Sequence, residues 1–238
     1  DYLIKNQNVN ENLKLTKFLV DEYLSKSELK KACDVFSKIN KAINDDYLLK
    51  FNLYCLINVN KKEEAQLLFD LKKEAGFEDK FFEKKFNYLM GYDDSIDQEI
   101  SKKTILDFHL SHRTNPEFKF DPNETTSKNI WRYLSTSNLL DSIENIDLED
   151  QNKIFIIEKA THERNYPEKE LFELYKRFQF NINQLLSVKQ SYKLLSNVEA
   201  RALIYQGILI TSEIELKMEL IKILKDLYIK EGIENAFK

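Results

Sequence analysis

The sequence predicts an all-α fold, a right-handed array of helical hairpins of the α-solenoid type with no β-sheet. Only 4 Gly and 3 Pro occur among 238 residues, whereas turn-rich β folds and glycine-rich nucleotide-binding folds need many more. Nearly every segment repeats its apolar residues at helical spacing, and no segment alternates strictly over the length of a strand. We therefore expect eleven or twelve helices and a helical content above roughly 60%.

Five helices are expected in the first 91 residues. Each places apolar side chains three or four residues apart on one stripe. Asn60 and Glu63 form a capping-box pattern at the start of the fourth helix, and Gly76 and Gly91 are typical helix stops. The expected helices cover about residues 13–24, 27–39, 45–58, 60–76 and 79–90.

An internal repeat links two of these helices. The stretches "KKACDVFSKI" and "KEEAQLLFDL" align at an offset of 33 residues, which places Ala32 on Ala65 and Phe36 on Phe69. A small residue lets the neighbouring helix approach, and the aromatic ring fills the space one turn later. Over about residues 14–90 this pattern resembles the tetratricopeptide class of helical repeat. The resemblance implies stacked helix pairs with a concave binding face, and an irregular helical array is the alternative.

The second half of the chain continues the helical pattern. Capping boxes are predicted for Ser196 with Glu199 and for Ser212 with Glu215, and Gly207 permits close helix packing. Helices are expected at about residues 100–111, 126–135, 137–143, 147–164 and 167–178, followed by two that begin at residues 196 and 212. The phrases "LYKRFQF", "LLSVKQSYKLL" and "EARALIYQ" are similar to uncharacterised bacterial helical proteins labelled antifreeze-glycopeptide-related, which implies a helical fold and no known activity.

The stretch "ILDFHLSHRTNPEFKFDPNETTSKNIW" joins the two halves. Pro116 and Pro122 interrupt helical structure, so residues 113–125 are expected to form an extended connector. Phe118 and Phe120 are expected to tuck under a neighbouring helix. We divide the chain into N-terminal helical hairpins at 1–110, a connector at 111–126 and a C-terminal helical segment at 127–238, packed continuously with the first as one domain.

Two histidines in this stretch could mark a metal site. His109 and His112 lie three residues apart, on one side of a helix, and that spacing can chelate a metal. Asp107 points the opposite way, and zinc sites use three or four protein ligands. Packed or helix-terminal histidines are therefore favoured over a partner contact or a metal site, and no metal or cofactor is expected.

Other motifs limit the function. Cys33 and Cys55 lack metal-site spacing and lie among apolar neighbours, which predicts buried free thiols. No Gly-x-Ser-x-Gly motif or phosphate-binding loop is present, so no catalytic residue is assigned. A net charge of -4 with scattered Lys and Arg argues against nucleic-acid binding. No apolar run approaches the ~20 residues of a membrane span. The compartment stays open between cytoplasm and periplasm, because a removed signal peptide leaves no trace.

These observations predict a non-catalytic helical scaffold that presents a groove to a protein or peptide. The candidate groove residues are His112, Arg113, Trp131 and Arg132, since exposed aromatic residues beside arginine form interface hot spots. For Trp131 a core position is favoured over a partly exposed position at the groove. Two alternatives remain: a helical accessory domain of a cell-wall-acting enzyme, and a small-ligand or lipid carrier with a cavity between helices.

Overall fold

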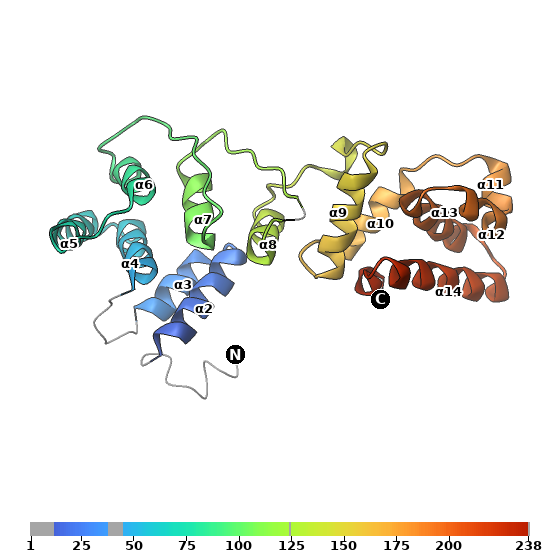
Figure 1. The fold of residues 1–238 in the computed structure, drawn as a ribbon, viewed down its shortest axis with the longest axis horizontal. Coiled ribbons are helices and arrows are strands. Elements are labelled where there is room, and N and C mark those ends of the chain that lie inside the picture. Colours follow the sequence, from blue (N-terminus) through green and yellow to red (C-terminus); the bar gives the residue numbers. More distant parts are fainter. Residues whose placement is uncertain (1–11, 38–44, 124, 238) are drawn as a thin grey trace. The chain divides into compact units, whose positions relative to one another are not determined.

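A computed structural model describes residues 12–37, 45–123 and 125–237 of the chain. Within these residues it contains thirteen α-helices (Figure 1). Together, α-helices and short 3-10 helices contain 67% of the described residues. No strand occurs in the described part of the chain. The all-α prediction is therefore confirmed, with slightly more helices than the eleven or twelve expected.

The chain divides into two compact units inside the predicted connector, Asp1–Phe120 (unit 1) and Asp121–Lys238 (unit 2). In unit 1, α2 packs on α3 and α4 packs on α5, while α7 contacts both α2 and α6. The last helix of the unit thus contacts the first helix of its described residues. The described helices of unit 1 are α2 (Leu13–Ser25), α3 (Leu29–Phe36), α4 (Asp46–Asn58), α5 (Lys62–Glu74), α6 (Lys80–Met90) and α7 (Ile105–Arg113).

The two helix pairs of unit 1 share three of their four boundaries at an interval of 33 residues, and only the ends of the second helices, Phe36 and Glu74, differ. The helix at 13–25 recurs at 46–58, and the second helix of each pair starts at 29 and at 62. Asn12 and Asp45 cap the first helix of each pair through their side chains. Ser27 and Asn60 take the same left-handed turn position, with φ of 59° and 61°. Capping and turn geometry therefore recur together with the sequence pattern.

The side chains that suggested the repeat are all buried. Ala32 and Ala65 are each 0% exposed, Phe36 is 6% exposed and Phe69 is 3% exposed. Their predicted burial is confirmed. Whether the pairs stack as a solenoid stays a prediction.

Helix boundaries confirm one predicted capping box and correct two others. Ser196 and Glu199 form the reciprocal box at the start of α13. Asn60 does not cap α5, because its left-handed conformation ends the preceding turn and α5 follows Lys61 without a side-chain cap. Ser212 does not cap α14, because that helix starts one residue too late, at Ile214. Gly91 ends α6 in the left-handed conformation, as predicted.

Unit 2 is built around α13 (Asn197–Ile210), which contacts α9, α10, α11, α12 and α14. A Cβ atom on Gly207 would lie 2.8 Å from Val188 of α12 and 3.3 Å from Leu220 of α14, so the missing side chain lets three helices meet, as predicted. The other elements of unit 2 are α8 (Lys128–Thr136), η2 (Ile143–Asn145), α9 (Gln151–His162), α10 (Glu168–Lys176), α11 (Ile182–Leu186), α12 (Val188–Ser191), η3 (Tyr192–Leu194), α14 (Ile214–Lys230) and η4 (Glu234–Ala236).

The Pro-containing connector is non-helical after Arg113, as predicted, although residues 111–113 at its predicted start belong to α7. No helix occurs between Arg113, the last residue of α7, and Lys128 among the residues described there. The rings of Phe118 and Phe120 lie 5.4 Å and 5.0 Å from the ring of Phe108 on α7, both edge-on. The connector is therefore fastened to α7 by its aromatic side chains. The prediction that the two halves pack as one domain remains a prediction.

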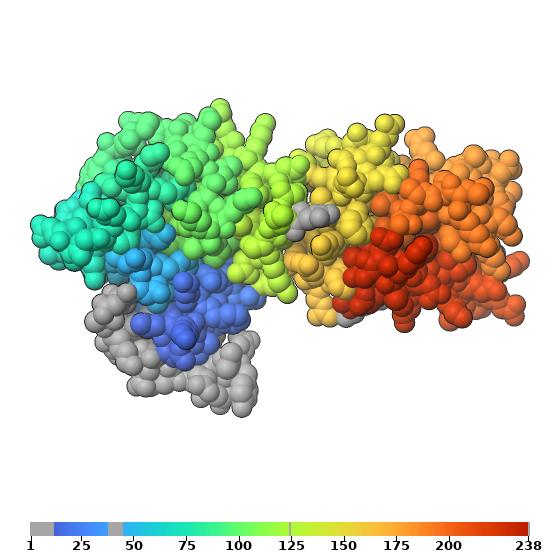
Figure 2. Space-filling view, viewed as in Figure 1, coloured from blue at the N-terminus to red at the C-terminus, as the bar shows by residue number. Residues whose placement is uncertain are grey.

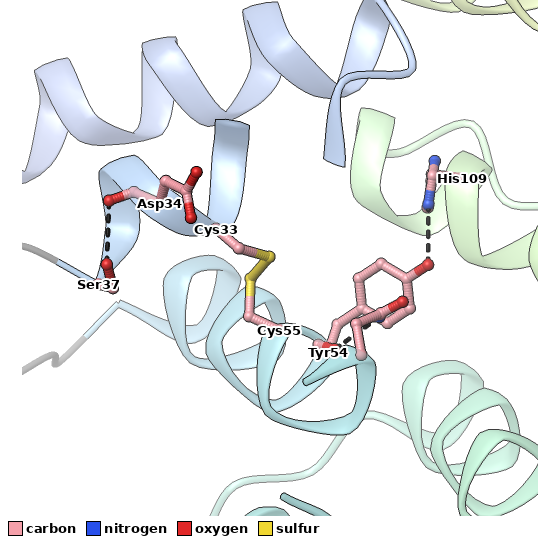
Figure 3. Close-up of a disulfide and its surroundings, with 7 residues drawn as sticks. Cys33, Asp34, Ser37, Tyr54, Cys55 and His109 are labelled. Atoms are coloured by element: carbon pink, nitrogen blue, oxygen red, sulfur yellow. Dashed lines mark hydrogen bonds between the residues drawn. A yellow bond between two sulfur atoms is a disulfide. The ribbon is translucent and has the colours of Figure 1, made fainter. Parts of the chain in front are cut away.

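Cys33 and Cys55 form a disulfide that joins α3 to α4, so the prediction of free thiols is wrong (Figure 3). Their Cα atoms lie 5.7 Å apart, which is within the reach of such a bond. A single pair of cysteines in apolar surroundings carries no pattern that separates a disulfide from two buried thiols. The pairing depends on how the two helices pack, which the sequence alone does not reveal.

Candidate binding surfaces

The four predicted groove residues are shared between the two units. His112 and Arg113 form the last turn of α7 in unit 1, where the His112 ring lies 5.2 Å from the Phe118 ring and Arg113 is exposed. In unit 2, Trp131 is 5% exposed and packs in the apolar core, the position that the sequence favours over the groove. The adjacent Arg132 is half-buried at a polar pocket. Neither unit by itself holds all four.

His109 is a packed, neutral imidazole. It is 5% exposed, its Nε2 atom lies 3.0 Å from the Tyr54 hydroxyl on α4 (Figure 3), and the two rings meet edge-on. Burial lowers the pKa of His109 to about 3, because a charged imidazole would lose its hydration. In the described residues, no group of three or more His, Cys, Asp or Glu side chains is placed to hold a metal ion.

A buried ion network lies beside a polar pocket of about 560 Å³ in unit 1. The Lys50 ammonium on α4 donates to Asp79 at 2.9 Å and to Asp107 at 2.8 Å. Burial alone would lower the pKa of Lys50, and the hydrogen bonds to Asp107 and Asp79 outweigh it, so the pKa lies above its usual value. An ammonium held between two carboxylates is a poor base. The network therefore ties α4 to the start of α6 and to α7.

A second buried ion network connects four helices of unit 2. Arg201 on α13 donates two hydrogen bonds to Glu158 on α9, at 2.8 Å and 2.5 Å. The Tyr175 hydroxyl on α10 donates to the same carboxylate and lies 2.8 Å from the Tyr228 hydroxyl on α14. Glu158 is 0% and Arg201 is 1% exposed. The position of this cluster in the core favours a structural role.

Unit 2 also contains a polar pocket of about 390 Å³. It holds the predicted candidate Arg132, together with Arg164 and Glu168, so charges of both signs line it. The Thr136 and Thr161 hydroxyls at its wall donate to backbone carbonyls of their own helices. The polar side chains of this pocket are therefore engaged within the protein to a greater extent than the composition of its lining suggests.

A groove of about 270 Å³ formed by α11, α12, α13 and the start of α14 is lined mainly by apolar side chains, and we call it the apolar groove. Gly207 lies at its base, where the three helices meet. Two large side chains on its rim are mostly exposed: Leu186 at 81% and Ile210 at 60%. These segments reach the surface in Figure 2, coloured orange to red. The apolar lining consists of Leu185, Leu186, Val188, Ile210, Leu216 and Leu220.

Sequence reasoning missed the apolar groove. Leu185 and Leu186 belong to a helix of only five residues, too short for a periodic pattern to separate an inner from an outer face. Ile210 is the last residue of a helix that is apolar around most of its circumference. The signal in the sequence was that Leu185 and Leu186 lie at the end of a short helix, where polar residues are usual.

Comparison with protein-family models, with curated proteins and with solved structures finds no match to this chain. No helix within the described ranges combines the length and apolarity needed to cross a membrane.

Proposed function

We propose that the chain is a non-catalytic helical scaffold whose apolar groove binds an apolar segment of a protein partner. The observation that carries the proposal is the exposure of Leu186 (81%) and Ile210 (60%) on the rim of a 270 Å³ apolar concavity. Full burial of a Leu or Ile side chain contributes about 1.5–3 kcal/mol. A partner that covers both rim residues would recover much of this free energy, and clustered exposed apolar side chains usually mark an interaction site.

The shape of the apolar groove favours a partner helix. A volume of about 270 Å³ accommodates a small number of side chains. An amphipathic helix presents such anchors at positions i and i+3 or i+4 and leaves its polar face in water. Of the polar side chains that also line the groove, Ser187 donates to the Asn183 carbonyl and Lys189 pairs with Glu219. Few side chains are therefore left to pair with a partner's backbone, which makes an extended strand a poorer fit.

Unit 1 supports the scaffold part of the proposal. We infer that its helix pairs are tetratricopeptide-like repeats. The recurrence of caps, turns and buried residues at 33 residues supports this, and α6 begins at residue 80, 34 residues after α4. Asp79 caps α6 by accepting from Phe82, as Asp45 caps α4 by accepting from Leu48. In repeat proteins, stacked pairs form extended binding surfaces.

The disulfide supports a place of action outside the reducing cytoplasm. Structural disulfides form and persist in oxidising compartments and are rare in the cytosol. Of the two compartments that the sequence left open, Cys33–Cys55 favours the periplasm.

Selection of peptides from a random display library against the whole chain tests the function. We expect the selected peptides to carry large apolar residues at i and i+3 or i+4. Binding should be lost in the double variant Leu186→Asp, Ile210→Asp and retained in Leu67→Asp, a matched control because Leu67 on α5 is 63% exposed. Peptides that bind the double variant as well as the unchanged protein would contradict the proposal.

A further inference from the structure

Helix α14 has two apolar faces, and the fold of unit 2 accounts for one of them. The inner face carries Leu220, Leu224 and Tyr228, which are 0–1% exposed. Among the described elements, α14 packs mainly against α13 and η4. A surface helix usually needs one apolar stripe, so a second stripe calls for another explanation.

The second stripe runs along the exposed side of α14. Ile214 is 78% exposed, Met218 is 62% exposed and Ile229 is 51% exposed. Half-buried Ile221 continues the stripe, and Lys225 lies within it. Successive members are three or four residues apart, which keeps them on one side of a helix with 3.6 residues per turn. We call these five residues the outer stripe.

The outer stripe is separate from the apolar groove. Leu216 and Leu220, which line the groove, each follow a stripe residue by two positions. Two positions correspond to a rotation of about 200° around a helix. The groove and the outer stripe therefore face different sides of α14 and can be changed independently.

Charges on the exposed side of α14 are separated along its length. Acidic side chains predominate in the N-terminal half and basic ones in the C-terminal half. An identical helix placed antiparallel would bring the acidic half of each copy against the basic half of the other, whereas a parallel one would bring like charges together. The charges are Glu213 (the N-cap), Glu215, Lys217 and Glu219 in the first half and Lys222, Lys225, Asp226, Lys230 and Glu231 (the C-cap, which accepts a hydrogen bond from Asn197) in the second.

We propose that the occupant of the outer stripe is α14 of a second copy of this chain, arranged antiparallel about a two-fold axis. Such an isologous contact is self-complementary by construction. It places Ile214 against Ile229 of the partner, and Met218 against the aliphatic stem of the partner's Lys225. Glu219 pairs with Lys189 within its own chain, so Glu213 and Glu215 are the acids that meet the partner's lysines.

The resulting dimer is weak. A helix of 17 residues is about 25 Å long, and contact along a single helix buries less area than a standard protein interface. We expect a dissociation constant in the micromolar range. Opposed helix dipoles add to the preference for the antiparallel arrangement.

Sedimentation velocity of the full chain, from low to several hundred micromolar, tests this pairing. We expect a reversible monomer–dimer equilibrium whose dissociation constant rises about tenfold or more in Met218→Lys, because the new ammonium would lie against the like charge of the partner's Lys225. Leu67→Lys, an equally exposed change in unit 1, should leave the equilibrium unchanged. A protein that is monomeric at every concentration would overturn the proposal, as would a Met218→Lys variant that dimerises normally.

Charge reversal tests the antiparallel direction. Reversing the acidic half alone (Glu213→Lys, Glu215→Lys) should weaken the dimer, and so should reversing the basic half alone (Lys225→Glu, Lys230→Glu). Combining all four changes in one chain should restore association, because each half again meets its opposite. Failure of the combined variant to regain association would overturn the antiparallel pairing. Leu186→Asp should leave the dimer intact, so the tests of the outer stripe and of the apolar groove fail independently.

Discussion

Opening the Cys33–Cys55 disulfide is expected to destabilise unit 1 by about 3 kcal/mol. The two cysteines are 22 residues apart. Closing a loop of that size removes about 11 cal/mol/K of entropy from the unfolded chain, which corresponds to about 3.4 kcal/mol at 25 °C. Cys55 is 8% exposed, and Phe36 and Phe51 meet edge-on in the same core. Two thiols would fit this apolar surrounding, so the loss is mainly the constraint on the unfolded chain.

Urea unfolding of the oxidised protein, the reduced protein and the double variant Cys33→Ala, Cys55→Ala measures this loss. With a slope of about 2 kcal/mol per molar urea, the midpoint of unit 1 should fall by about 1.5 M. Both cysteines belong to unit 1, so the loss should appear in the unfolding of that unit. Equal midpoints for oxidised and reduced protein would refute the reasoning, and so would two titratable thiols in the native protein.

Three further changes test the packing. The free energy of unfolding should fall by up to about 1.4 kcal/mol per pH unit from pH 6.5 towards pH 3, because His109 takes up a proton in the unfolded chain but stays neutral in the folded one. In urea titrations, His109→Asn should show a weaker dependence of the free energy of unfolding on pH. Arg201→Met should cost about 3–5 kcal/mol by leaving Glu158 buried without its partner, and thermal unfolding should show most of this loss recovered when Glu158→Leu is added. Phe69→Ala should cost about 3–5 kcal/mol and Leu67→Ala less than about 0.5 kcal/mol, as compared by urea midpoints.

The features that the sequence predicts well are local. Helical periodicity and the scarcity of Gly and Pro identify the fold class, because both act within a few residues. Gly91 and the Ser196 capping box mark helix ends through their own backbone geometry. Pro116 and Pro122 predict the connector, because proline restricts the residues on both sides of it. Asn60 was misassigned because the same residue type favours both an N-cap and a left-handed turn.

The features that the sequence does not predict join residues far apart in the chain. Lys50 and Asp107 are 57 residues apart, and a lysine on a helix is usually solvated. Arg201 meets Glu158 across 43 residues. Trp131, a groove candidate, lies in the core. Whether a large aromatic side chain points inward or outward depends on which helices surround it, and the sequence does not show this. Exposed Leu186 becomes informative only when the groove beneath it is known.

The affinity of the tightest selected peptide for three forms of the protein tests the role of the apolar groove most directly. The forms are the unchanged chain, the double variant Leu186→Asp, Ile210→Asp, and the control Leu67→Asp, and fluorescence anisotropy with a labelled peptide gives each dissociation constant. Loss of two apolar anchors, each contributing about 1.5–3 kcal/mol, should weaken binding by about a hundredfold or more in the double variant. The control should bind like the unchanged chain. An equal affinity for all three forms, or an equal loss in the control, would contradict the assignment of the groove as the binding site.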